Sequence, residues 1–269
     1  MWSAIDIYCR LISIRIRAQL QYRISFLLDL VAAAFATATG FGTLALVLQR
    51  FDNIAGWTLG EVAFLYGMVE TAFGIMDLFF SGFDPDTFGP MVQRGRFDQL
   101  LLRPVSITLQ VLGSDIALRR LSRITQGIIV LGIALALVNI RWTPAKVAYL
   151  PLVLVSLIAF FGGLFIIGST TTFWTVKRVE AINIFTYGGS EMMAYPMHIY
   201  TKWMRHFFTY IIPAIFLNYY PALYFLDKPD PLHMPSFAPF LSPVAGFGML
   251  AAALAFWRFG IRHYTSTGT

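Results

Sequence analysis

The sequence predicts an all-α integral membrane protein with six transmembrane helices, and three observations support this fold class. The chain has 269 residues, of which 57% are hydrophobic and 13% are charged, whereas a soluble domain carries charge on about a quarter of its residues. Apolar runs long enough to cross a bilayer recur along the chain, and basic residues gather on alternate connecting segments. The formal net charge of +6 fits arginines that anchor the inner side of a membrane protein, so we expect no nucleic-acid partner.

The predicted spans follow from length. A helix needs about 20 apolar residues to cross roughly 30 Å of hydrocarbon. Six segments meet this requirement: residues 26–48, 62–80, 124–140, 147–173, 182–200 and 240–259. No flexible linker divides them, so residues 1–269 are expected to form a single transmembrane domain. The sequence shows no internal repeat, which counts against the paired-repeat architecture of many secondary transporters.

Residues 207–226 are also long enough to span, but Pro213, Asn218 and Pro221 interrupt them. A proline lacks the backbone donor and clashes with the preceding helical turn. We therefore expect two short half-helices that form a re-entrant hairpin on the outer side, before the last span. Irregular backbone is costly in lipid, so the other helices should cover it. A seventh full span is the alternative.

Basic residues indicate the orientation. With six spans and an inner N-terminus, fourteen lysines and arginines lie on inner segments and six on outer segments, and a seventh span changes this to thirteen against seven. Both counts favour the same orientation of the first spans. Because charge hardly separates the two topologies, the prolines decide for six spans with both termini cytoplasmic.

Residues 1–25 are expected to form an amphipathic helix that lies in the inner membrane interface. Polar side chains recur on one stripe of this helix, opposite a wide apolar face that includes Ile5 and Ile12. The stripe consists of Asp6, Arg10, Ser13, Arg17 and Gln21. The single cysteine, Cys9, excludes an internal disulfide.

Residues 81–106 are expected to form a cytoplasmic loop between the second and third spans. The stretch SGFDPDTFGP (residues 81–90) is rich in turn-forming glycine and proline. Apolar residues such as Met91 and Leu102 then alternate with polar and charged ones, which favours a short amphipathic helix. Pro104 limits this helix, because a residue before proline avoids the helical region. Such a helix needs a surface on which to dock.

Three motifs in sequence resemble a known family. They are GRFDQLLLRPVS (residues 95–106), YPMHIYTKWMRHFFTYIIPAIFLNYYPALYFL (residues 195–226) and YTSTG (residues 264–268). Their order and spacing resemble permeases of the ABC-2 superfamily of ATP-binding-cassette transporters, and in particular a bacterial branch formerly catalogued as a domain of unknown function. The resemblance covers nearly the whole chain.

This resemblance implies the permease subunit of an exporter in the bacterial inner membrane, which works by alternating access together with a second permease subunit, identical or homologous. It further implies a coupling helix that fits into a cleft of a cytoplasmic ATPase. The residues assigned to this contact are Gln93, Arg94, Arg96, Phe97, Asp98, Leu101 and Arg103. The alternative is an ordinary basic inner loop with an apolar patch on the bilayer.

The energy source is expected on another polypeptide. No glycine-rich loop that ends in Gly-Lys-Ser/Thr occurs, since none of the four lysines follows a glycine. We therefore expect this chain to bind no cofactor and to catalyse no reaction. ATP and magnesium would be bound by a partner ATPase dimer.

Three acidic residues are predicted at membrane depth, where each costs a few kcal/mol. Glu70 and Asp77 share one face of the second span, and Glu191 lies in the fifth. We expect them to line a substrate path for cationic or polar groups, with Met192 and Tyr195 as an adaptable wall. Buried structural acids, hydrogen-bonded or protonated, are the alternative.

Two other classes of protein compete with the permease. An integral-membrane lipid or isoprenoid transferase would show clustered aspartates or histidines, and a stand-alone ion-coupled carrier would show repeats. No metal site is expected, because His198 and His206 lack a third ligand nearby. Drug-like cations, lipids and glycans all stay open as substrates.

Overall fold

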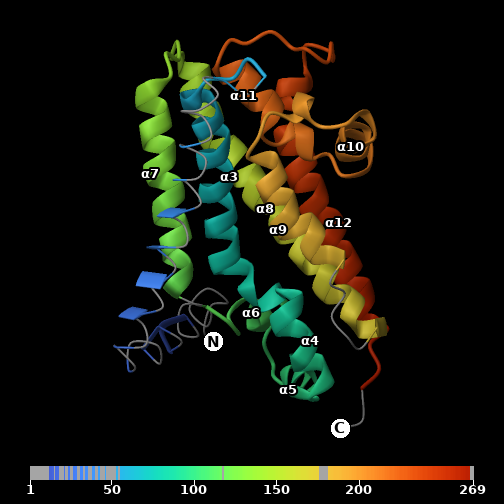
Figure 1. Ribbon diagram of the computed structural model, residues 1–269. Helices are drawn as coiled ribbons and strands as arrows, with labels where there is room; N and C mark the ends of the chain where they lie inside the picture. Colours follow the sequence, from blue (N-terminus) through green and yellow to red (C-terminus); the bar gives the residue numbers. More distant parts are fainter. Residues whose placement is uncertain are drawn as a thin grey trace.

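The computed structural model describes residues 53, 55–116, 118–175 and 181–266, with isolated positions between 12 and 46. The architecture is all-helical (Figure 1). The α-helices are α3 (Leu59–Phe80), α4 (Pro85–Gln93), α5 (Arg96–Leu101), α6 (Ile107–Leu112), α7 (Leu121–Leu137), α8 (Pro144–Thr175), α9 (Ala181–Met193), α10 (Lys202–His206), α11 (Tyr219–Phe225) and α12 (Ser242–Arg262). Short 3-10 or π segments lie at Ser81–Phe83, Leu118–Arg120, Met197–Ile199, Phe207–Ile211, Ala214–Phe216 and Ala238–Phe240.

Three helical stretches among the described residues are long and apolar enough to cross a membrane. They are Leu59–Gln93, Pro144–Thr175 and Ser242–Arg262, and the shorter apolar helix is α7. Helix α8 has 32 residues, so it is about 48 Å long and exceeds the hydrocarbon core. These four helices confirm the predicted segments 62–80, 124–140, 147–173 and 240–259 as helical.

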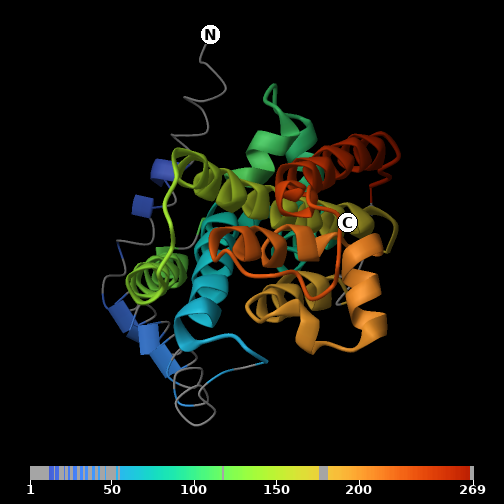
Figure 2. The same cartoon turned by 90° about the horizontal axis from the view of Figure 1, so that it is seen from above.

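The long helices pack in two pairs, α3 with α7 and α8 with α12, and contacts between α3 and α8 join the pairs. Figure 2 shows from above that α12 lies beside α8. Glycines permit the close approach of α3 and α7: Gly60, Gly67 and Gly74 recur every seven residues along α3 and face α7. A Cβ atom on Gly67 would lie 2.7 Å from the Cα atom of Leu131. Helices without side chains at their contact can bring their backbones together.

Glycines of the predicted fourth span also serve packing within this chain. A Cβ atom on Gly162 would lie 2.8 Å from the ring of Phe80, and one on Gly163 would lie 3.0 Å from Met249 of α12. These two positions are therefore filled by the chain's own helices. Most of residues 1–25 and 26–48, the predicted interfacial helix and first span, lie outside the described residues.

The predicted fifth span, residues 182–200, is wrong in its second half. Helix α9 ends at Met193 and has 13 residues, about 20 Å at 1.5 Å per residue. Pro196 follows in an extended conformation and precedes the 3-10 turn Met197–Ile199. The missing N–H of proline and the restriction on the residue before it explain the early end.

Residues 207–226 form short pieces instead of one rod, as the prolines predict. A π segment ends at Ile211, Pro213 follows, and α11 begins after Asn218. The buried Asn218 side-chain amide donates to the carbonyl oxygens of Leu65 (3.2 Å) and Met193 (2.8 Å). This segment is therefore tied to α3 and to the end of α9. Its re-entrant depth in a membrane stays a prediction.

Candidate coupling site

Helices α4 and α5 form a compact hairpin at the end of the molecule opposite α11 (Figure 1). Asp84 caps α4 by accepting the backbone N–H of Asp86 at 3.0 Å, and Pro85 occupies the first helical position. Gly95 joins the helices with a φ of 65°, a left-handed conformation that favours glycine. The predicted coupling segment, residues 81–106, is thus built from two helices and a turn that ends near Pro104.

Aromatic rings hold this hairpin to the spans. The Phe97 ring of α5 is fully buried and lies 5.5 Å from Phe88 of α4, 5.0 Å from Phe173 of α8 and 6.2 Å from Trp257 of α12, measured between ring centroids. Trp257 also donates its indole N–H to the Thr108 hydroxyl at 3.1 Å. We call Phe83, Phe88, Phe97, Phe173, Trp257 and Tyr264 the aromatic cluster. Phe97, expected at the ATPase contact, instead points into the chain's own core.

The C-terminal motif meets the coupling motif. The Tyr264 ring lies 5.0 Å from Phe97, and the Ser266 hydroxyl donates to the Asp98 carboxylate at 2.8 Å. Burial of the Tyr264 hydroxyl, together with the nearby Asp98 carboxylate, raises its pKa to about 12. Asp98 is therefore bound to the chain's own C-terminal segment, and two of the three recognised motifs form one structural unit.

The remaining predicted coupling residues lie on the outside of the hairpin. Gln93, Arg94, Arg96 and Arg103 are exposed. Leu101 is 40% exposed, and the adjacent Leu102, which the sequence did not single out as a contact residue, is 86% exposed. Leu101 and Leu102 together form a small exposed apolar patch directly before Arg103, which fits a contact surface.

An ionic network links the start of α4 to three other helices. The Asp84 carboxylate accepts the Tyr187 hydroxyl of α9 at 3.0 Å and lies 3.9 Å from the Arg120 guanidinium, which precedes α7. Arg120 also lies 3.3 Å from Asp77 of α3 and 3.7 Å from Asp115. Asp77, predicted on a substrate path, is therefore buried in an ion pair.

Glu70 has the same kind of partner. Its carboxylate accepts two hydrogen bonds from Arg123 of α7, at 2.7 and 2.9 Å, and Arg123 stacks over the Phe73 ring at 4.1 Å. Only 3% of Glu70 is exposed. The structure thus agrees with the structural alternative for Glu70 and Asp77. Arg120 and Arg123 were not predicted as their partners, because they lie 43 and 53 residues away in the chain.

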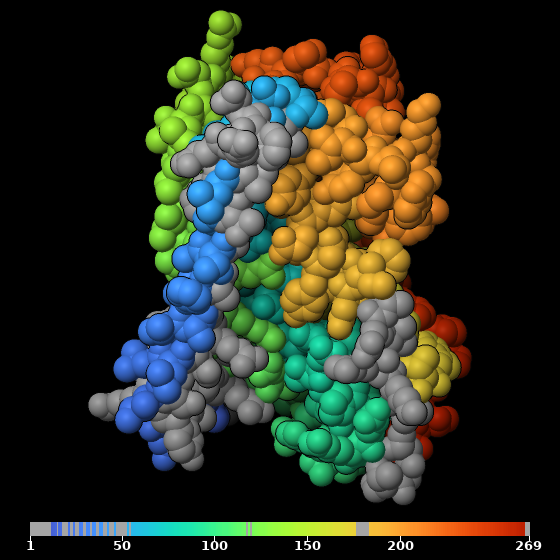
Figure 3. All heavy atoms as spheres, in the orientation of Figure 1, coloured from blue at the N-terminus to red at the C-terminus, as the bar shows by residue number. Residues whose placement is uncertain are grey.

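The other predicted substrate-path residues lie together near the end of α9. The side chain of Glu191 is exposed, Met192 is buried and Tyr195 is half-buried. Helix α9 lies on the face of the molecule turned to the viewer in Figure 3. Among the described residues, the Glu191 carboxylate forms no hydrogen bond or ion pair.

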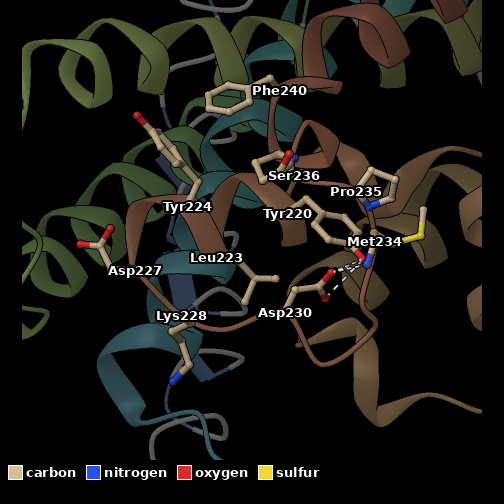
Figure 4. A pocket seen from close by; sticks show the side chains of 11 residues that line it. Tyr220, Leu223, Tyr224, Asp227, Lys228, Asp230, Met234, Pro235, Ser236 and Phe240 are labelled. Carbon is tan, nitrogen blue, oxygen red and sulfur yellow. Dashed lines mark hydrogen bonds between the residues drawn. The ribbon is translucent and has the colours of Figure 1, made fainter.

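A pocket of about 310 Å³ lies at the opposite end, between α11 and the loop that follows it (Figure 4). Tyr220, Tyr224 and Phe240 form its aromatic walls. Asp230 accepts the backbone N–H groups of Leu232 (2.8 Å) and Met234 (2.7 Å) and thereby fixes the loop. The sequence did not predict this pocket, since its walls come from two separate segments.

No group of three or more metal-ligating side chains occurs in the part of the chain that the structure describes. The candidate site is a hairpin with one face packed on the ends of α8 and α12 and the other face exposed.

Three helical stretches among the described residues are long and apolar enough to cross a membrane, which indicates a multi-pass membrane protein. The family model of the ABC-2 family transporter proteins matches residues 34–268, so the chain belongs to this family. Its members are typically non-catalytic permeases, and membership implies an ATPase partner. No curated protein and no solved structure matches the chain.

Proposed function

We propose that this chain is the permease subunit of an ABC exporter, which moves its substrate across the bacterial inner membrane by alternating access. A separate ATPase dimer that binds ATP and magnesium drives the change, and a second permease subunit completes the pathway. Both termini and the α4–α5 hairpin are cytoplasmic in this proposal, and the segment around α11 is a re-entrant hairpin on the outer side.

One observation carries the proposal: the hairpin is open on one face and rigidly attached on the other. On the open face Gln93, Arg94, Arg96, Leu101 and Arg103 are exposed. On the attached face Phe97 packs on Phe173 and Trp257, at the ends of α8 and α12.

Displacement of this hairpin would therefore move the spans. Aromatic rings in a packed core transmit force because the interior has few voids to absorb it. The Asp84 carboxylate adds a polar connection to Tyr187 of α9 and to Arg120 before α7. A partner that closes on the open face can thus shift four helices together.

The proposed substrate path runs along α9. An acid at membrane depth is stable when it faces a water-filled cavity or a partner, and Glu191 is exposed. With Met192 and Tyr195 it would contact cationic or polar groups of the substrate. Glu70 and Asp77 would support this path indirectly, by fixing α3 against α7 through their arginines.

Co-purification and ATPase assays test the coupling. The tagged chain should bring down an ATPase with a Gly-Lys-Ser/Thr loop. Arg94→Glu combined with Leu102→Glu should uncouple the two activities, so that ATP hydrolysis no longer drives transport. Arg258→Glu combined with Arg262→Glu is the matched control, because these exposed arginines lie on α12. Substrate-stimulated ATPase activity that is equal in both variants would exclude the hairpin as the coupling element.

Transport assays test the path separately. Glu191→Gln keeps the size of the side chain and removes its charge, so export of a cationic substrate should fall while ATPase co-purification stays intact. Full transport by this variant at normal expression would remove Glu191 from the path.

A further inference from the structure

Helix α10 and the π segment that follows it form one continuous helical arm on the side of the bundle, over residues 202–211. We call these residues the α10 arm. In Figure 1 α10 is seen nearly along its own axis, and in Figure 2 the same orange helix lies in the plane of the view, at the edge of the molecule. The arm therefore runs across the direction of the long helices. This is the orientation of a helix that lies in the plane of a membrane interface.

One face of the α10 arm packs on the protein. The Phe207 ring stacks on Phe185 of α9, with 5.9 Å between the ring centroids. Met204 and Phe208 are half-buried and pack against the hydrophobic core. These contacts fix the arm on the bundle, so the orientation of its other face is fixed as well.

The other face of the arm carries exposed aromatic side chains. Trp203 is 68% exposed and Tyr210 is 71% exposed. Together with the exposed His206 they follow the three- and four-residue spacing of one helix face, and the His206 and Tyr210 ring centroids are 6.0 Å apart. Ile211 is also exposed and extends this face. Trp and Tyr combine an apolar ring with a polar tip and are enriched where a membrane protein passes from hydrocarbon to water.

The α10 arm is also basic. Lys202 is exposed and Arg205 is half-buried, and neither side chain forms an ion pair within the described residues. The sequence contains no aspartate or glutamate between Glu191 and Asp227. Two cations without a carboxylate partner favour an anion at this surface.

A lipid surface matches this combination of groups better than a second copy of the chain. A two-fold contact through the same face would bring Lys202 and Arg205 of both copies together, and like charges repel. In an anionic phospholipid, phosphate groups lie directly beside acyl chains. Basic side chains and exposed aromatic rings can therefore both be satisfied at one lipid surface.

We propose that the α10 arm binds the headgroup region of anionic phospholipids. Lys202 and Arg205 contact the phosphate groups, while Trp203, Tyr210 and Ile211 lie at the boundary between headgroups and acyl chains. This binding requires only that the chain lies in a membrane, and it does not depend on the ATPase.

Native mass spectrometry of the purified full chain tests the lipid preference, with phosphatidylglycerol and phosphatidylcholine of matched acyl chains as probes. Phosphatidylglycerol should be retained in preference to phosphatidylcholine. Lys202→Gln combined with Arg205→Gln should weaken this retention about tenfold or more, because each basic side chain attracts the anionic headgroup. A circular-dichroism melting curve checks the fold. If the double variant is destabilised, Lys202→Gln alone, at an exposed position, should weaken retention about threefold or more, and no loss in this variant would overturn the proposal.

The control is Arg258→Gln combined with Arg262→Gln, which removes two exposed arginines of α12. It should retain phosphatidylglycerol as the unchanged protein does. An equal loss in the two double variants would show nonspecific attraction and overturn the assignment to the arm. Equal retention of the two lipids would overturn the preference for an anionic headgroup.

The fluorescence of Trp203 tests what covers the arm. In phosphatidylglycerol nanodiscs, the difference in emission between the unchanged protein and Trp203→Phe isolates the signal of this side chain. Lipid brominated near the headgroup should quench this signal more strongly than iodide in the water. Quenching by iodide alone would place the arm in water, and protection from both quenchers would indicate a second copy of the chain on this face. Either result would overturn the lipid assignment.

Discussion

The buried and half-buried lysines at one end of the molecule are paired, whereas three exposed arginines at the other end are not. At the end with α11, Lys146 donates to the Asp227 carboxylate at 2.8 Å and to the Phe225 carbonyl at 3.0 Å, and Lys228 donates to Glu61 at 2.8 Å. At the end with α5, the exposed Arg94, Arg96 and Arg103 form no ion pair within the described residues. Both ends contain aromatic side chains packed on α8.

This difference indicates which end is complete and which end needs a partner. At the α11 end, consecutive residues Asp227 and Lys228 connect α8 and α3, with Asp227 in a left-handed conformation at a φ of 51°. The chain thus satisfies these charges internally. At the α5 end, the aromatic cluster buries only the inner face of the hairpin. The basic and apolar side chains of its outer face stay exposed and can contact another molecule.

The largest expected effect contrasts the two faces of the α5 end. Phe97→Ala should lower the free energy of unfolding by about 3–5 kcal/mol, because it leaves a cavity in the aromatic cluster. Leu102→Ala, five residues further along the chain and 86% exposed, should change the free energy of unfolding by less than about 0.5 kcal/mol. Thermal or denaturant unfolding of the purified variants in detergent measures both. Similar losses would mean that the hairpin has no distinct attached face.

A smaller effect is expected for the charge pairs of the α11 end. Asp227→Asn leaves the Lys146 ammonium, which is buried, with a neutral partner, and should cost about 2 kcal/mol of stability. Arg94→Gln at the other end should be neutral within about 0.5 kcal/mol, because no ion pair is lost. If Arg94→Gln destabilised the isolated chain as much as Asp227→Asn, the contrast between the ends would fail.

The smallest effect concerns pH at the α5 end. Tyr264 has a pKa of about 12 in the folded chain, against an ordinary value of 10.0. Folding therefore favours the neutral hydroxyl, and its contribution to stability is fully present below pH 10 and is lost as pH rises toward 12. Tyr264→Phe should flatten the fall in melting temperature over this range. An unchanged alkaline profile in Tyr264→Phe would assign the fall to other groups.

Helix positions were largely predictable because they depend on local composition. Apolar runs predicted α3, α7, α8 and α12, and Pro213 and Asn218 predicted the interruption before α11. The same reasoning applied to Pro196 would have ended α9 early, and the seven-residue spacing of Gly60, Gly67 and Gly74 could have predicted the contact with α7.

The partners of the charged residues could not be predicted in this way. Glu70 and Arg123 are separated by 53 residues, and Asp98 and Ser266 by 168. Periodicity along one segment gives the face on which a residue lies, but not the helix that will cover it. For that reason the sequence suggested a substrate path for Glu70 and Asp77, which are paired with arginines in the structure. It likewise suggested an ATPase contact for Phe97, which is buried inside the chain.

By itself the sequence determined that this chain is a helical membrane protein, because the cost of burying peptide groups and charges in hydrocarbon acts on every segment separately. Its motifs identified the ABC-2 family. Only the tertiary structure decided which polar groups neutralise one another and which remain open, because each ion pair and aromatic contact requires two distant segments to meet. That pairing makes one end of the molecule self-sufficient and leaves the other end ready to bind.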